Sequence, residues 1–163
     1  MRNKKVLFVA QAALIAAIYV VLTYFVSAFH MASGVIQVRL SEALTILPMF
    51  TPAAIPGLAI GCFLSNLLTG CLPMDVLCGS LATLIGAVGS YLLRKHKWLV
   101  PLPPVVANIA IVPYVLAYVY GAEGSIPFFM VTVGVGEVIS CYVLGSILMN
   151  ALLPYRNILF KNI

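Results

Sequence analysis

Residues 6–29 constrain the fold more than any other stretch, because 24 consecutive positions carry no charged side chain. At about 1.5 Å per residue, a helix of this length can cross the roughly 30 Å hydrocarbon core of a bilayer. The stretch is also longer than the apolar core of about 7–15 residues found in secretory signal peptides. The sequence therefore predicts a retained membrane-spanning helix near the start of the chain.

The whole chain has the same apolar character. Its 163 residues are 63% hydrophobic and only 8% charged, whereas a typical soluble domain carries about a quarter charged residues. We therefore predict an all-α integral membrane bundle that forms one membrane-embedded substrate-binding domain over residues 1–163. The nine basic residues are scattered between apolar segments, which argues against nucleic-acid binding.

Five further apolar segments follow the first, at residues 41–50, 52–69, 75–93, 98–120 and 126–153. A helix over 41–50 reaches only about 15 Å, which is too short to cross a bilayer alone. Counting it as a span nevertheless places eight of the nine basic residues on one side, as the positive-inside rule requires. We therefore expect six spans in the cell membrane, with both termini cytoplasmic and the short second span completed by the loop before it.

Small residues recur four positions apart in three of the expected spans. Such stripes let helices approach closely in lipid, where packing drives association. The glycine-containing stripes predict contacts inside the bundle, whereas the alanine stripe lies in the cytoplasmic half of a bulky span and suits a partner protein. The stripes are Gly57, Gly61 and Ser65; Ala82, Gly86 and Ser90; and Ala12, Ala13, Ala16 and Ala17.

The sequence contains none of the enzyme motifs that we sought. It has no GxxxxGK[ST] loop for ATP, no HExxH and no GxSxG, so we expect neither an enzyme nor a bound cofactor. His30 and His96 fall on opposite faces of the expected topology, which argues against a histidine metal site. The four cysteines are expected to behave as small apolar side chains, although a disulfide between Cys71 and Cys78 stays open.

Glu137 is the strongest polar signal, since it lies eleven residues into the last span, about 16 Å along a helix. A carboxylate in lipid is costly, so it is expected to face the bundle interior or a cavity, with a paired structural role as the alternative. Asn108 and Tyr114 lie in the fifth span, where each alone also fits an interhelical contact. Together the three predict a site for a flat, nitrogen-rich ring, because a carboxylate accepts charge-assisted hydrogen bonds from adjacent N–H donors.

Four polar residues at the expected outer face complete the candidate substrate-binding set. Arg39 and Glu42 would share one face of a helix, and the alternative is an exposed salt bridge worth about 0–1 kcal/mol. Asp75 follows Pro73 at the start of a span, where a helix cap is the alternative to ligand contact. Asn66 ends the third span and suits either a structural or a binding role.

Three motifs resemble the QueT family of S-components, the substrate-binding subunits of energy-coupling-factor (ECF) transporters. They are VRLSEALTILP at residues 38–48, PAAIPG at 52–57 and DVLCGSLATL at 75–84, and the likeness extends over residues 6–154. The family is associated with uptake of queuosine precursors, which are 7-deazaguanines. The resemblance therefore implies capture of such a base at the extracellular face.

The resemblance also implies a ligand covered by the outer loops 30–39, 70–74 and 120–125. It implies that the first-span alanines contact a membrane-embedded T-component, and that two separate ATPase subunits hydrolyse ATP, in keeping with the missing ATP loop. An alternative is a stand-alone proton-coupled carrier of a small nitrogen heterocycle or another vitamin-like solute, with Glu137 as its proton site. A membrane enzyme is the least supported alternative.

Overall fold

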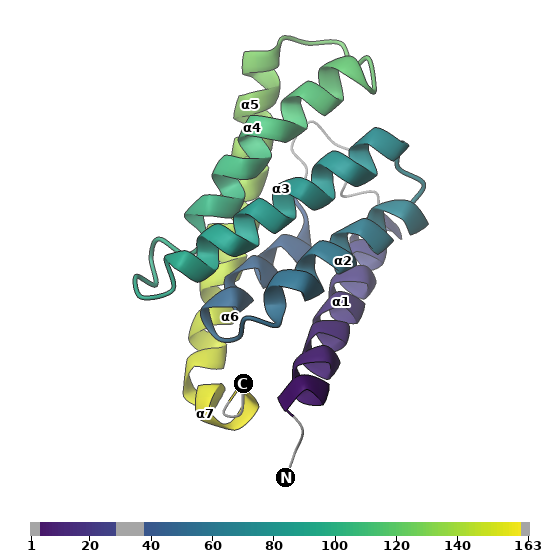
Figure 1. Cartoon of the computed structure of the whole chain (residues 1–163). Coiled ribbons are helices and arrows are strands. Elements are labelled where there is room, and N and C mark those ends of the chain that lie inside the picture. Colours follow the sequence, from purple (N-terminus) through teal and green to yellow (C-terminus); the bar gives the residue numbers. More distant parts are fainter. Residues whose placement is uncertain (1–3, 29–37, 161–163) are drawn as a thin grey trace.

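The computed structural model describes residues 4–28 and 38–160, and every regular element in these ranges is helical (Figure 1). Six helical segments follow one another in the predicted order, which confirms the all-α bundle. They are α1 (Lys4–Ala28), η1 (Leu40–Met49), α2 (Ala54–Leu68), α3 (Pro73–Leu92), α4 (Leu102–Tyr118) and a last segment built from α5 (Ile126–Glu137), η2 (Val138–Leu144), α6 (Gly145–Leu152), η3 (Leu153–Tyr155) and α7 (Arg156–Leu159).

Three of these segments are long and apolar enough to cross a membrane, namely α1, α3 and the last segment. The apolar segments η1, α2 and α4 are shorter. Large apolar side chains cover much of the outer surface, among them Leu77, Leu81 and Val131, as lipid contact requires. The start of α1 meets α7 at one end of the bundle, where the Gln11 side-chain amide donates a hydrogen bond to the Leu159 carbonyl at 3.2 Å (Figure 1).

The short second segment, η1, is a 3₁₀ helix that lies inside the bundle. Every residue from Ser41 to Pro48 is buried, and the segment packs against α1, α2, α3, η2 and α6. The larger rise of a 3₁₀ helix, about 2.0 Å per residue, gives these ten residues a reach of about 20 Å. Ile46 of η1 packs in the central apolar cluster with Tyr19, Leu58 and Met149. This central position explains why a segment too short to cross alone is so apolar.

Glycines of α2 allow close contact with α1. A Cβ added to Gly57 would lie 2.7 Å from the Ala12 carbonyl oxygen, and one added to Gly61 would lie 2.8 Å from the Tyr19 Cβ. Both distances are too short for a side chain, so this stripe serves contact inside the bundle, as predicted.

Glycines of α3 likewise allow close contact with α4. A Cβ on Gly86 would lie 2.7 Å from the Pro104 Cα, and one on Gly89 would lie 2.5 Å from the Pro103 Cβ. The Ser90 hydroxyl also donates a hydrogen bond to the Val100 carbonyl, at 2.7 Å. This second stripe too serves the bundle interior, as predicted.

The alanine stripe of α1 divides between two faces of the helix. Ala12 and Ala16 face the glycines of α2, and Ala16 is buried. Ala13 and Ala17 are exposed on the other side of the helix. Ala13 and Ala17 are therefore the most accessible members of the stripe, Ala12 is half-buried, and Ala16 is covered by α2.

Candidate functional site

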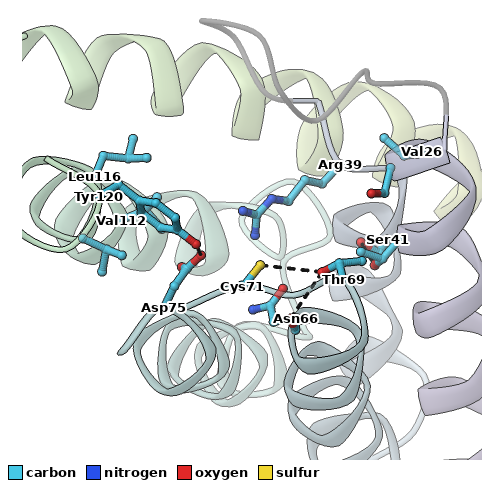
Figure 2. Close-up of a pocket in the computed structure, with 13 residues that line it drawn as sticks. Val26, Arg39, Ser41, Asn66, Thr69, Cys71, Asp75, Val112, Leu116 and Tyr120 are labelled. Carbon is cyan, nitrogen blue, oxygen red and sulfur yellow. Dashed lines mark hydrogen bonds between the residues drawn. The ribbon is translucent and has the colours of Figure 1, made fainter. Parts of the chain in front are cut away.

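A cavity of about 590 Å³ opens at one end of the bundle (Figure 2). It lies where α1, α2 and α4 end and where η1 and α3 begin, so chain segments far apart in sequence share it. Its walls carry one guanidinium, one carboxylate, one amide, hydroxyls and one thiol. The lining residues are Thr23, Val26, Ser27, Arg39, Ser41, Asn66, Thr69, Cys71, Asp75, Val112, Val115, Leu116 and Tyr120.

Arg39 places its guanidinium in this cavity (Figure 2). It directly precedes η1, and its backbone N–H donates a hydrogen bond to the Ser140 hydroxyl at 3.1 Å. The Glu42 carboxylate does not bond to this guanidinium, because one oxygen accepts a hydrogen bond from Tyr19 and the other has no hydrogen-bond partner. Arg39 is therefore held by its backbone, and among the described residues no side chain takes up its guanidinium donors, which can bind a ligand.

Asp75 contributes the carboxylate of the cavity. The start of α3 has no side-chain cap, and Asp75 instead accepts a hydrogen bond from the Tyr120 hydroxyl at 2.7 Å (Figure 2). Tyr120 lies in the loop beyond the last residue of α4 and also accepts a hydrogen bond from the Leu72 N–H at 3.3 Å. Partial burial and the bond to Asp75 raise the pKa of this hydroxyl above its usual range, so it remains a donor.

Asn66 supplies the amide, next to Asp75. A Cβ added to Gly79 would lie 3.0 Å from the Asn66 amide nitrogen and 3.9 Å from an Asp75 carboxylate oxygen. The two side chains therefore converge over Gly79, whose missing side chain leaves room for both. An amide and a carboxylate at one place can both accept hydrogen bonds from a polar ring, and the amide can also donate.

A layer of buried polar side chains lies one helical turn deeper than the cavity. Tyr19 precedes the lining residue Thr23 by four positions, and Asn108 precedes Val112 by four. Tyr19 donates its hydrogen bond to Glu42 here. The second oxygen of Glu42 is buried without a hydrogen-bond partner, which is a costly state.

Glu137 belongs to this buried layer and does not line the cavity. It accepts hydrogen bonds from Asn108 and from the Cys141 thiol, whose sulfur lies 3.4 Å from Oε2. Cys141 lies in η2, a π-helical turn of a kind that often occurs at functional sites. Glu42, Glu137 and Cys141 bring potential metal-ligand atoms within 4.8 Å of one another, but Tyr19 and Cys141 already donate to these carboxylates.

The candidate residues named from sequence thus fall into three groups. Arg39, Asn66 and Asp75 line the cavity, whereas Glu42, Glu137 and Asn108 lie in the buried layer beneath it. Tyr114 does neither, because it is exposed and its ring stacks on Tyr118 with the centroids 6.4 Å apart. Residues 29–37, most of one loop expected to cover the ligand, lie outside the described residues.

Sequence reasoning did not name several lining residues, chiefly Tyr120, Cys71, Thr23 and Thr69. Tyr120 begins the segment 120–125 that the resemblance places over the ligand, and this position could have identified Tyr120 as a lining residue. All four cysteines are free thiols, including Cys71, which lies in the cavity 3.6 Å from the Thr69 hydroxyl.

Comparison with known proteins relates the chain to a family of transporters. The model of a family described as "QueT transporter" matches residues 9–154. A "Queuosine precursor transporter QueT" from Lactococcus lactis subsp. cremoris (strain MG1363) is 35% identical over 85 residues, which are 52% of this chain and 50% of that protein. The match to this relative therefore spans only half of its length. No solved structure matches the chain.

Proposed function

Because the chain belongs to the QueT transporter family, we propose that it captures a queuosine precursor of the 7-deazaguanine class as the S-component of an ECF-type importer. The observation that carries this proposal is the cavity into which Arg39, Asn66 and Asp75 converge. A deazaguanine presents a ring carbonyl beside N–H and amino donors. The guanidinium suits the carbonyl, and the carboxylate and amide suit the donors.

The distribution of basic residues supports an extracellular position for the cavity. Lys4 and Lys5 begin α1, Arg94 follows α3, and Arg156 begins α7, all at the ends of helices remote from the cavity. Basic residues gather on the cytoplasmic side of membrane proteins. The end that holds the cavity then faces outward, both termini lie in the cytoplasm, and the chain resides in the cell membrane.

Transport itself requires partners in this proposal. The chain has no ATP-binding loop, so two separate ATPase subunits supply the energy and a T-component transmits it. Ala13 and Ala17 on the exposed face of α1 are the proposed contacts with the T-component, because small residues allow close helix approach in lipid.

Titration of the purified protein with a panel of purine-like compounds tests the binding function. The proposal expects one 7-deazaguanine bound per chain, without an ion gradient, and weaker binding of guanine and adenine. Uptake by vesicles that hold this chain alone, driven by a pH gradient, would instead support the proton-coupled carrier. No binding of any deazaguanine would contradict the proposed function.

A further inference from the structure

The cavity carries its charges at two separate places. Arg39 directly precedes η1 and points its side chain into the cavity. Asp75 lies on the first turn of α3, beside Tyr120 (Figure 2). Asp75 bonds to Tyr120 and not to the guanidinium. A ligand that lies between them therefore meets a donor group at one side and an acceptor group at the other.

Asp75 retains hydrogen-bonding capacity toward the cavity. Only 8% of the residue is exposed, yet it lines the cavity, and Tyr120 bonds to just one of its oxygens, Oδ2. The other oxygen, Oδ1, lies on the side of Gly79, where the Asn66 amide also lies. Water solvates such a buried carboxylate poorly, so a positively charged ligand group next to it would stabilise it strongly.

The carboxylate of Asp75 has no basic partner in the part of the cavity wall that the structure describes. Arg39 is the one basic side chain among the described lining residues, and Asp75 bonds to Tyr120 instead of to the guanidinium. A ligand with a positive substituent would supply the opposite charge that Asp75 lacks.

We propose that Asp75, supported by Tyr120 and Asn66, forms a subsite for a protonated amine on the ligand, while Arg39 faces a ring carbonyl. This inference rests on the proposed function and narrows its substrate class to deazaguanines that carry an amine substituent. Tyr120 orients the carboxylate through Oδ2, and the ligand amine donates to Oδ1. No covalent step is involved, so the subsite acts on affinity and selectivity alone.

A matched ligand pair tests the subsite on the unaltered protein. 7-Aminomethyl-7-deazaguanine and 7-cyano-7-deazaguanine share the ring and differ in one substituent, which is a cation in the first and neutral in the second. We expect the amine to bind about tenfold to a hundredfold more tightly by isothermal titration calorimetry. The ratio of the two affinities should fall as salt is raised, because salt screens the ion pair. Equal affinities, or tighter binding of the nitrile, would overturn the inference.

Substitutions then locate the effect. Asp75→Asn keeps the shape of the side chain and removes its charge, so it should reduce the ratio of amine to nitrile affinity about tenfold or more. Lys95→Gln is the control, since it removes a charge from an exposed position beyond the far end of α3 and should preserve the ratio. A ratio unchanged in Asp75→Asn would overturn the inference, as would an equal loss in Lys95→Gln.

The outcomes separate this inference from the proposed function. Binding of both compounds with equal affinity removes the amine subsite and leaves capture of deazaguanines standing. Binding of neither compound contradicts the proposed function itself and the subsite with it.

Discussion

Tyr19 of α1 donates a hydrogen bond to the Glu42 carboxylate of η1 in the centre of the bundle, where both side chains are almost fully buried. This bond ties the first span to the short central helix. It also gives one Glu42 oxygen its partner, while the other oxygen has none. Burying a carboxylate is costly unless hydrogen bonds compensate, so this pair matters for stability.

Tyr19→Phe should lower the stability of the bundle by about 1–3 kcal/mol, because it leaves Glu42 with no hydrogen bond to its side chain. The melting temperature of the purified protein in detergent measures the effect. Tyr24→Phe is the control, since Tyr24 lies on the same helix and is exposed. Equal melting temperatures for the two variants would show that the bond to Glu42 contributes nothing.

Glu137→Gln should weaken binding of a 7-deazaguanine about tenfold, or roughly 1.4 kcal/mol. Glu137 lies in the layer beneath the cavity, where its Oε2 accepts a hydrogen bond from the Cys141 thiol. Glutamine replaces one acceptor oxygen by an NH₂ donor and so disturbs the layer that supports the cavity. Calorimetric titration of the variant measures the loss, with Lys95→Gln, at an exposed position beyond the other end of α3, as the control. Unchanged affinity in Glu137→Gln would remove Glu137 from the site.

Ala13→Leu and Ala16→Leu should act differently, although the residues are three positions apart. Ala13 is exposed, so leucine there should preserve ligand binding and reduce uptake by the assembled transporter. Ala16 is buried against Gly61, so leucine there should lower the free energy of unfolding by about 1–3 kcal/mol through overpacking, which a lower melting temperature would report. Normal uptake by Ala13→Leu would contradict the docking role of this face.

Gly86→Ala should destabilise the bundle by about 1–3 kcal/mol, because the new Cβ would lie 2.7 Å from the backbone of Pro104. Gly134→Ala is the matched control, since its Cβ would meet only the flexible end of Ile109, at 3.1 Å. Melting temperatures of the two variants should therefore differ. A larger loss in Gly134→Ala would mean that the contact between α3 and α4 is less rigid than the structure shows.

The sequence was sufficient for the helices because charged residues and helix breakers mark their ends. The predicted first span, residues 6–29, and the observed α1, Lys4–Ala28, differ by two residues at most at either end. The 3₁₀ conformation of η1 could not be predicted, since a short, mainly apolar segment has the same sequence pattern in either kind of helix. Its central position depends on neighbours far away in sequence.

The site was predicted less completely. The depth of a residue along a helix can be counted from the sequence, but the direction in which its side chain points cannot. Counting residues placed Glu137 well inside its span, yet only packing shows that it lies below the cavity. The bond between Asp75 and Tyr120 joins residues 45 positions apart through a loop whose path the sequence does not specify. The same reasoning explains the division of the alanine stripe between a buried and an exposed face.

Cys71 allows a direct test of the central claim, that a deazaguanine binds in this cavity, because its free thiol lines the cavity wall. We would measure the rate of alkylation of Cys71 by a water-soluble maleimide, by mass spectrometry, with and without the ligand. Cys78 lies outside the cavity and serves as the internal control. The account predicts that saturating 7-deazaguanine ligand slows alkylation of Cys71 about tenfold or more and leaves the rate at Cys78 unchanged. Ligand binding with no protection of Cys71 would contradict the account.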